Sequence, residues 1–375
     1  MSEGAAEPLA PRETATLFGH DTAERTLAEA AGSGRLPHAW LITGPRGIGK
    51  ATLAYRFARF MLTGAAESAG LFAEALPDSL HVAPDHPVFH RVAAAGHADL
   101  FTLERTRDER TGKRRGEIVV KEARALGAFL RLTPAEGGWR VAIVDSADDL
   151  NRNAANAILK LLEEPPDKAL LILVSHAPNR LLPTVRSRCR RLALKPLSED
   201  DLARVLGAHL NALPSAGDLA ALTRLSDGSA GRAFALLSAG GLALYREMVA
   251  LLGTLPALDV VAAHRFCDRF TGDAAAEAGA LARALLVRWL TRLIRDTTMG
   301  TPETTPETTP ETVPGEAAAL AAAAGGLVDP RRATALWDSV SELFRNADAA
   351  RLEPRAVLLD AFLAIERAAR GGGTA

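Results

Sequence analysis

The stretch AWLITGPRGIGKATLAYRFARFM, residues 39–61, is the most informative segment of this chain. Its first part, residues 39–43, is a short apolar run, which predicts a buried strand. The segment Gly44-Pro-Arg-Gly-Ile-Gly49-Lys50 follows, and residues 51–61 carry apolar side chains at helical spacing. A strand, a glycine-rich loop and a helix in this order are typical of a phosphate-binding loop, in which backbone N–H groups and the helix N-terminus surround a phosphate. A plain glycine-rich turn is the alternative, and the complete context favours phosphate binding.

One position of the loop departs from the usual pattern. Lys50 would reach the outer phosphates of a nucleotide, but the next residue, where a Ser or Thr hydroxyl normally coordinates Mg²⁺, is Ala51. Thr52 is adjacent, but it points about 100° further round the helix. We therefore expect a weak or vestigial site for ATP or ADP, with Mg²⁺ bound only together with nucleotide.

A second part of the predicted site lies at the end of a later strand. The apolar run Trp-Arg-Val-Ala-Ile-Val, residues 139–144, leads to Asp145. A carboxylate at this place in a phosphate-loop protein usually holds Mg²⁺ through water, and the alternative is an Asp that caps a strand-to-helix turn. The next residue is Ser146. Its hydroxyl cannot accept a proton at neutral pH, so it cannot serve as a base that aligns an attacking water. The predicted nucleotide-binding residues are Gly44, Pro45, Arg46, Gly47, Ile48, Gly49, Lys50, Ala51, Thr52 and Asp145.

Length and composition limit the possible classes of protein. A chain of 375 residues suits two or three domains, and its net charge of −1 means that any contact with nucleic acid must be local. The two cysteines, Cys189 and Cys267, make neither a disulfide framework nor a cysteine-based metal site. No apolar run is long enough to span a bilayer and the N-terminus lacks a signal core, so we expect a cytoplasmic protein without membrane contact.

Two surface features leave alternatives open. His81, His86, His90 and His97 fall in an irregular, proline-containing stretch, and a solvated connector is favoured over a zinc site because no ligand spacing supports one. Arg105–Arg115 is the basic tip of a predicted hairpin between strands at residues 100–103 and 117–120. A solvated hairpin is favoured there over contact with DNA phosphates.

The order of the predicted elements indicates the fold class. Residues 154–164 form a strong helix that Pro165-Pro166 ends, and residues 169–174 form a continuous apolar strand. Apolar strands that alternate with helices after a phosphate loop imply a parallel sheet with helices on both faces. From Pro196 onward the pattern is helical, except for a TPETT repeat within residues 301–314 that cannot form a helix.

Four segments of the chain form a recognisable set: GPRGIGKATLAYRFARFM, VAIVDSADDLNRNAANAILKLLEEPP, LILVSHAPNRLLPTVRSRC and DGSAGRAFALL. The most specific parts are the helical segment from Asn156 to Pro166 and the Ser187-Arg188-Cys189 triplet. Together the four segments resemble the bacterial clamp-loader AAA+ family of DNA polymerase III.

The resemblance implies a domain organisation. We expect a flexible arm at residues 1–14, a RecA-like AAA+ nucleotide domain at residues 15–195 and a small helical lid at residues 196–240. A helical collar for oligomerisation would follow at residues 241–375, with a flexible insert at residues 301–314.

The resemblance also implies a function. Family members belong to a complex that loads the sliding clamp onto primed DNA during replication, within a DNA-directed DNA polymerase (nucleotidyltransferase) holoenzyme. The expected partners are tau/gamma and delta subunits, and through them the clamp and DNA. Arg188 matches the arginine finger that acts in trans on a neighbour's ATP.

The chain departs from the active ATPases of that family at four positions. Ala51 and Ser146 replace the Mg²⁺ hydroxyl and the catalytic carboxylate, His176 stands about where a sensor Asn or Thr is found, and Gly231 takes the place of the lid arginine. The family's four-cysteine zinc module is also absent from the sequence. These losses fit the members that hydrolyse ATP poorly. The alternatives are an autonomous P-loop AAA+ ATPase, a tau/gamma-type ATPase, or an assembly protein that retains only the fold.

Overall fold

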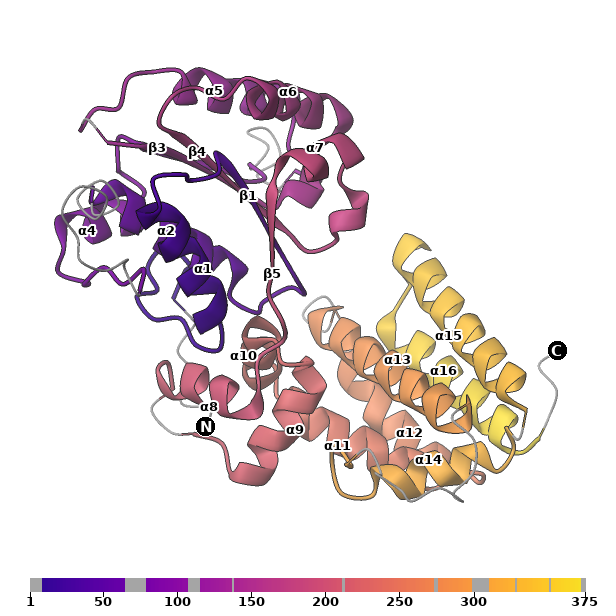
Figure 1. Cartoon of the computed structure of the whole chain (residues 1–375). Coiled ribbons are helices and arrows are strands. Elements are labelled where there is room, and N and C mark those ends of the chain that lie inside the picture. The colour runs from indigo at the N-terminus through magenta and orange to yellow at the C-terminus, as the bar shows by residue number, and fades with distance from the viewer. Residues whose placement is uncertain are drawn as a thin grey trace. The chain divides into compact units, whose positions relative to one another are not determined.

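The computed structural model describes residues 9–64, 79–106, 115–136, 138–210, 213–272, 276–298, 310–327, 329–350 and 352–371. The chain forms two compact units (Figure 1). Unit 1 comprises residues 1–213 and 226–234, and unit 2 comprises residues 214–225 and 235–375. The predicted lid, residues 196–240, is thus divided between the two units, and the expected three-domain organisation stays a prediction.

Unit 1 is built on a five-stranded sheet with the order β2-β3-β4-β1-β5. All neighbouring strands are parallel, as predicted, and β1 lies between β4 and β5. Parallel pairing brings the carboxyl ends of all strands to one edge, which is where ligands bind in open α/β sheets. The strands are β1 (Ala39–Thr43), β2 (Leu100–Leu103), β3 (Arg140–Asp145), β4 (Ala169–Ser175) and β5 (Arg190–Ala193).

Helices cover both faces of this sheet, which confirms the predicted fold class (Figure 1). Successive residues of a strand point to opposite faces, so Trp40 and Ile42 of β1 enter one core while Ala39 and Leu41 enter the other. The first core is formed with α1 (Asp21–Gly32), α2 (Lys50–Leu62) and α4 (Pro87–Ala93), and the second with α5 (Val120–Leu130), α6 (Arg152–Glu163) and α7 (Pro183–Arg188).

Shorter elements complete unit 1, and helices make up the described part of unit 2. Unit 1 also contains η1 (Ala147–Asp149), η2 (Pro178–Arg180) and α8 (Glu199–Gly207). The chain passes between the units within α9 (Ala216–Ser226) and α10 (Ala230–Ser238). Unit 2 continues with α11 (Gly241–Leu252), α12 (Val260–Cys267), η3 (Asp268–Phe270), α13 (Ala276–Thr298), α14 (Glu316–Ala324), α15 (Pro330–Ala350) and α16 (Pro354–Ala369).

One apolar core holds unit 2 together. Trp289 of α13 and Phe362 of α16 are completely buried in it, and the apolar stripe of α15 that includes Leu336 and Val340 faces it as well. Among the described residues, no single helix is both long and apolar enough to cross a membrane, and only α10 and α11 taken together reach that length and composition.

The predicted strand at residues 117–120 is wrong. Ile118 forms one isolated parallel bridge with Leu150, and α5 already begins at Val120. Ile118 donates its N–H to Asp149 O (2.7 Å) and its side chain is completely buried in the core with α5 and α6. This segment therefore pairs with the chain after β3 instead of forming a hairpin with β2. The basic residues 107–114 of the predicted tip lie outside the described residues.

The expectation of a free arm at residues 1–14 does not hold for its last part. Arg59 of α2 is only 1% exposed and donates hydrogen bonds to Arg12 O (2.9 Å) and Thr14 O (2.7 Å). A buried guanidinium needs acceptors, and these two carbonyl groups supply them. Residues 1–8 lie outside the described residues.

The predicted flexible insert at residues 301–314 also needs a correction at its end. Residues 301–309 lie outside the described residues, but Val313 is only 2% exposed in the core of unit 2. Glu316, which is completely buried, accepts hydrogen bonds from Thr312 N (2.5 Å), Arg292 Nη1 (2.8 Å) and the Tyr245 hydroxyl. This network fastens the end of the insert to α11 and α13.

Replacing Glu316 with Ala should strongly destabilise the protein. The change leaves the Arg292 guanidinium, the Tyr245 hydroxyl and the Thr312 N–H without their shared acceptor, and breaking a buried ion pair costs about 3–5 kcal/mol. Chemical denaturation of the full-length chain measures this loss. Glu342→Ala is the control, because Glu342 is exposed on α15 and its removal should change the free energy of unfolding by less than about 0.5 kcal/mol. Equal stability of the two variants would contradict the anchoring role.

Candidate functional site

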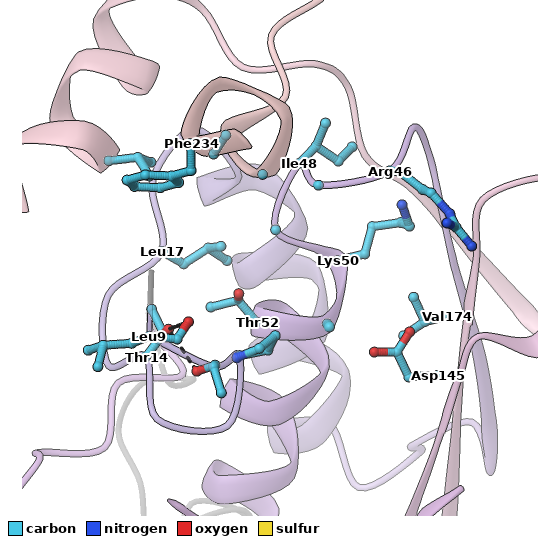
Figure 2. A pocket seen from close by; sticks show the side chains of 18 of the residues that line it. Leu9, Thr14, Leu17, Arg46, Ile48, Lys50, Thr52, Asp145, Val174 and Phe234 are labelled. Carbon is cyan, nitrogen blue, oxygen red and sulfur yellow. Dashed lines mark hydrogen bonds between the residues drawn. The ribbon is translucent and has the colours of Figure 1, made fainter. Parts of the chain in front are cut away.

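A cavity of about 550 Å³ lies in unit 1 at the carboxyl ends of β2, β3 and β4. Figure 2 shows Lys50 and Arg46 on the same side of it as Asp145, with Leu17 and Phe234 on the other. One wall is therefore charged and the opposite wall is apolar, which suits a ligand with phosphates at one end and a ring at the other. The apolar residues that line the cavity include Leu9, Pro11, Leu17, Phe18, Leu197, Val205 and Phe234.

The predicted phosphate loop borders this cavity between β1 and α2. Gly47 and Gly49 have φ angles of +74° and +102°, which side chains other than glycine rarely adopt. A Cβ atom at Gly47 would also lie 2.4 Å from the Ser229 hydroxyl oxygen. The loop therefore requires glycine at this position for both its backbone conformation and its close contact with the start of α10.

Five consecutive carbonyl groups of the loop accept hydrogen bonds from other groups of unit 1. Lys50 Nζ donates to Gly44 O (2.7 Å) and to Pro45 O. The remaining three bonds are Ser229 Oγ to Arg46 O (2.8 Å), Gly231 N to Gly47 O (2.9 Å) and His20 Nε2 to Ile48 O (2.6 Å).

Lys50 is well placed to meet a phosphate, although its ammonium group now contacts the loop itself. Its side chain is 3% exposed, and burial lowers its pKa to about 8 against the opposing influence of Asp145 and Asp148. A phosphate that entered the cavity would stabilise the charged ammonium and compete with Gly44 O and Pro45 O for it.

Asp145 lines the cavity at the end of β3, as the sequence predicted. Burial raises its pKa, and the nearby carboxylate of Glu104 raises it further. Ser146 also lines the cavity, but its hydroxyl donates to Asp148 Oδ2 (2.9 Å). The carboxylate that the resemblance predicts at this position for an active ATPase is absent, and the Ser146 hydroxyl is hydrogen-bonded to Asp148.

Asp148 supports the end of β4. Its carboxylate accepts hydrogen bonds from Ser175 Oγ (2.7 Å), His176 N (2.5 Å) and Ala177 N (3.1 Å). Burial alone would raise the pKa of Asp148, but these bonds and the one from Ser146 outweigh burial and lower it. Asp148 is thus a charged anchor that fixes where His176 lies.

His176 lines the cavity as a neutral side chain. Burial lowers its pKa to about 4, and the cations Lys50 and Arg46 contribute to this shift. Gly231 also lines the cavity, whereas the neighbouring Arg232 pairs with Asp227 (2.6 Å) on an exposed surface. Ala51 and Thr52 both line the cavity.

Sequence reasoning missed three charged residues of the cavity, namely Glu104, Arg105 and Asp149. Leu103 of β2 pairs with Val144 of β3. The next residue in each case, Glu104 after β2 and Asp145 at the end of β3, therefore lies at the same edge of the sheet. Residues 147–149 form η1 after β3, and Arg105 Nε lies 3.0 Å from Asp149 Oδ2. The sequence signal for Glu104 was its position, because it is the polar residue directly after the apolar strand β2.

Arg188 is not among the described residues that line the cavity. It ends α7, its side chain is 38% exposed, and its guanidinium lies 3.0 Å from Glu163 Oε1 of α6. The structure thus brings the predicted residues 46–52 and Asp145 to one cavity, whereas Gly44, Pro45 and Arg188 are not among the described residues that line it.

Two histidines of the predicted connector, His86 and His97, accept hydrogen bonds from the nearby backbone. His86 Nδ1 accepts a hydrogen bond from Val88 N (3.1 Å) at the start of α4, and His97 Nδ1 accepts one from Asp99 N (3.2 Å). In the part of the chain that the structure describes, no group of three His, Cys, Asp or Glu side chains is placed to hold a metal ion.

Comparisons with known proteins find relatives in sequence and in fold. Residues 19–198 match the family model described as "DNA polymerase III, delta subunit". The chain is 38% identical over 162 residues to DNA polymerase III subunit delta′ of Pseudomonas aeruginosa, which covers 43% of this chain and 44% of that protein. It is 28% identical over 255 residues to subunit tau of Salmonella typhimurium, which covers 65% of this chain and 36% of that protein. The chain thus spans less than half the length of either relative.

Solved structures give lower similarity. A DNA polymerase III gamma subunit-related protein of Thermotoga maritima matches with a TM-score of 0.44 and 15% identity, over 92% of this chain and 99% of that one. RuvB of Thermotoga maritima matches with a TM-score of 0.39 and 15% identity, over 78% of this chain and 82% of that one. The likeness therefore rests on the family model and the sequence relatives: residues 19–198 match the DNA polymerase III delta-subunit family, and the chain is similar in sequence to delta′, tau and gamma subunits of DNA polymerase III.

Proposed function

We propose that this chain is a delta-prime-type subunit of the DNA polymerase III clamp loader, which places the sliding clamp on primed DNA. One observation carries the proposal. The cavity retains Lys50 and Asp145, but the hydroxyl and the carboxylate that hydrolysis needs are replaced by Ala51 and Ser146. A subunit of this kind contributes to a neighbour's ATPase site and turns over little ATP itself. Its partners are tau/gamma and delta subunits, and with them it forms part of the polymerase holoenzyme.

The nucleotide site of this chain is suited to holding phosphates better than Mg²⁺. The loop and Lys50 offer N–H and ammonium donors, whereas the Ala51 side chain has no oxygen to coordinate a metal, and burial together with the Glu104 carboxylate raises the pKa of Asp145. ATP or ADP would therefore bind weakly, with the phosphates at Gly47–Lys50 and the ring against the apolar wall near Phe234. Any Mg²⁺ would arrive with the nucleotide.

The proposed finger is Arg188. A guanidinium stays ionised and presents several donors in one plane, so it suits the charge of a γ-phosphate. Its present partner is Glu163, whose side chain is 44% exposed. A surface ion pair contributes little free energy, so the guanidinium can exchange this carboxylate for a phosphate at small cost.

An autonomous ATPase or a tau/gamma-type ATPase is the competing function. Its support is the retained Lys50 and Asp145, which line one cavity as they do in working P-loop enzymes. The position of Ser146 argues against an ATPase function, because its hydroxyl is hydrogen-bonded to Asp148 and cannot activate water. Direct measurement of turnover separates the two functions.

The isolated chain should hydrolyse ATP negligibly. Losing groups that position the metal or the attacking water typically costs 10²-fold or more in rate. A phosphate-release assay on the purified full-length chain tests this, and Lys50→Ala is the control for contaminating ATPases. Turnover near 1 s⁻¹, which is ordinary for such enzymes, that disappears in Lys50→Ala would show that the chain is an ATPase itself.

Arg188→Ala should lower the DNA-stimulated ATPase and the clamp-loading rate of a complex reconstituted with tau/gamma and delta subunits. A finger in trans contributes roughly 10³-fold or more at its own site, but the other sites of the complex keep theirs, so we expect a partial loss. Arg190→Ala is the matched control, since Arg190 is an exposed arginine two residues away in β5.

Both arginine variants should keep the wild-type melting temperature and still co-purify with the partner subunits. Wild-type clamp loading by Arg188→Ala would refute the finger assignment. Equal losses in Arg188→Ala and Arg190→Ala would point to a general basic strip instead of one specific arginine.

A further inference from the structure

We infer that Ser229 and Gly231, in the turn that starts α10, are positioning residues that hold the phosphate loop in its binding conformation before a nucleotide arrives. The inference rests on the proposed nucleotide site and adds two residues to it. Neither residue was predicted from the sequence to bind nucleotide. Ser229 is 2% exposed, and it is separated from the loop by more than 180 residues of sequence.

The Ser229 hydroxyl joins two elements. Its oxygen accepts a hydrogen bond from Arg232 N (3.2 Å), which caps the first turn of α10, and its single hydrogen is donated to Arg46 O (2.8 Å). Because a backbone carbonyl can only accept, the direction of the second bond is fixed. An alanine at position 229 would lose both hydrogen bonds. Amide exchange at residues 46–50 reports the loss of the bond to the loop, and exchange at residues 232–233 reports the loss of the helix cap.

Gly231 makes the second connection through its backbone. Its N–H lies in the first turn of α10, where helical N–H groups have no partner within the helix, and it donates to Gly47 O (2.9 Å). A Cβ atom built on Gly231 would lie 3.1 Å from Gly47 Cα, and one built on Gly47 would lie 2.4 Å from the Ser229 hydroxyl. Two glycines are therefore needed for the turn and the loop to approach so closely.

The turn is itself anchored to unit 1. Leu197 N donates to Gly228 O (2.9 Å), and Gly228 has a φ of +67°, with its Cα so close to Leu197 that a Cβ atom would lie 2.5 Å from Leu197 O. The turn can therefore act as a support for the loop.

These contacts orient the loop. Arg46 O and Gly47 O are hydrogen-bonded to the start of α10, and Ile48 O is hydrogen-bonded to His20. These bonds fix the peptide planes of the loop. Because the N–H group lies in the same plane as the carbonyl group, they also determine where the loop N–H groups point. Only Lys50 must exchange partners when phosphate binds. An arginine at position 231, as the resemblance implies for active ATPases, would put a side chain against Gly47 and disturb this contact.

Hydrogen–deuterium exchange of the nucleotide-free, full-length chain tests the inference. In Ser229→Ala, amides of residues 46–50 should exchange roughly fivefold faster, the change expected from losing a hydrogen bond of about 1 kcal/mol. Ser238→Ala is the matched control, because Ser238 lies exposed at the end of the same helix and its hydroxyl donates only to Ala235 O (3.2 Å). It should leave the loop amides unchanged.

Exchange in the first turn of α10 separates positioning from simple capping. Faster exchange at residues 232–233 with unchanged exchange at residues 46–50 would overturn the inference, because Ser229 would then only cap its helix. Gly231→Ala gives a second test, since its methyl group should loosen the same loop amides without removing the cap. Unchanged loop exchange in this variant would also count against the inference.

Binding of fluorescent ADP then links the loop to the ligand. We expect Ser229→Ala to weaken binding roughly fivefold, in line with the same hydrogen bond, and Ser238→Ala to bind as the wild type does. If the wild-type chain binds no ADP, the proposed nucleotide site fails, but the exchange experiment still decides whether Ser229 and Gly231 hold the loop. Wild-type affinity in Ser229→Ala, with binding intact in the parent chain, would remove the functional role of the contact.

Discussion

Parallel pairing of β1 between β4 and β5 is the constraint on which the site depends. It places the loop after β1, Asp145 at the end of β3 and His176 after β4 along one edge of the sheet. Both faces of β1 are buried, so a shift of its register by one residue would exchange the side chains of the two cores. The packing of α1, α2 and α4 on one face and of α5, α6 and α7 on the other therefore fixes the loop in space.

Electrostatic balance sets what the cavity can bind. Arg46, Lys50 and Arg105 face Glu104, Asp145 and Asp149 around the same space, so the cavity holds equal numbers of cationic and acidic side chains. Burial weakens the charged forms of both Lys50 and Asp145. Phosphates would favour the ammonium, whereas the missing hydroxyl at Ala51 leaves a metal with fewer ligands. In the nucleotide site that we propose, these features favour phosphate recognition over metal-assisted hydrolysis.

Buried charges outside the site explain why segments that look flexible in sequence are held. Arg59 needs acceptors inside unit 1 and finds them in residues 12–14, and Glu316 needs donors inside unit 2 and finds one at Thr312. In both cases a polar segment of the chain, residues 12–14 or Thr312, supplies backbone groups that form hydrogen bonds with a buried charge. Composition alone could not predict this, because Arg59 is 45 or more residues from its acceptors, and the other donors to Glu316, Arg292 and Tyr245, are 24 and 71 residues away.

The local sequence determined the parallel α/β class, the phosphate loop and the helical character of the C-terminal part. Continuous apolar runs such as residues 169–174, glycines that must adopt positive φ, and the proline stops after residue 164 are local signals that need no tertiary information. They also predicted one nucleotide site with Lys50, in the loop after β1, and Asp145, at the end of β3, and both residues line the same cavity.

Only the tertiary structure decided how the loop is supported and which other charges surround it. Ile118 pairs with the chain after β3, Glu104 reaches the cavity through strand register, and Ser229 bonds to Arg46 across 183 residues. A serine at the start of a helix is expected to cap it, and nothing local shows that its hydrogen is donated elsewhere. That bond exists because packing of the turn against Leu197 brings α10 to the loop, and such proximity is a property of the folded chain.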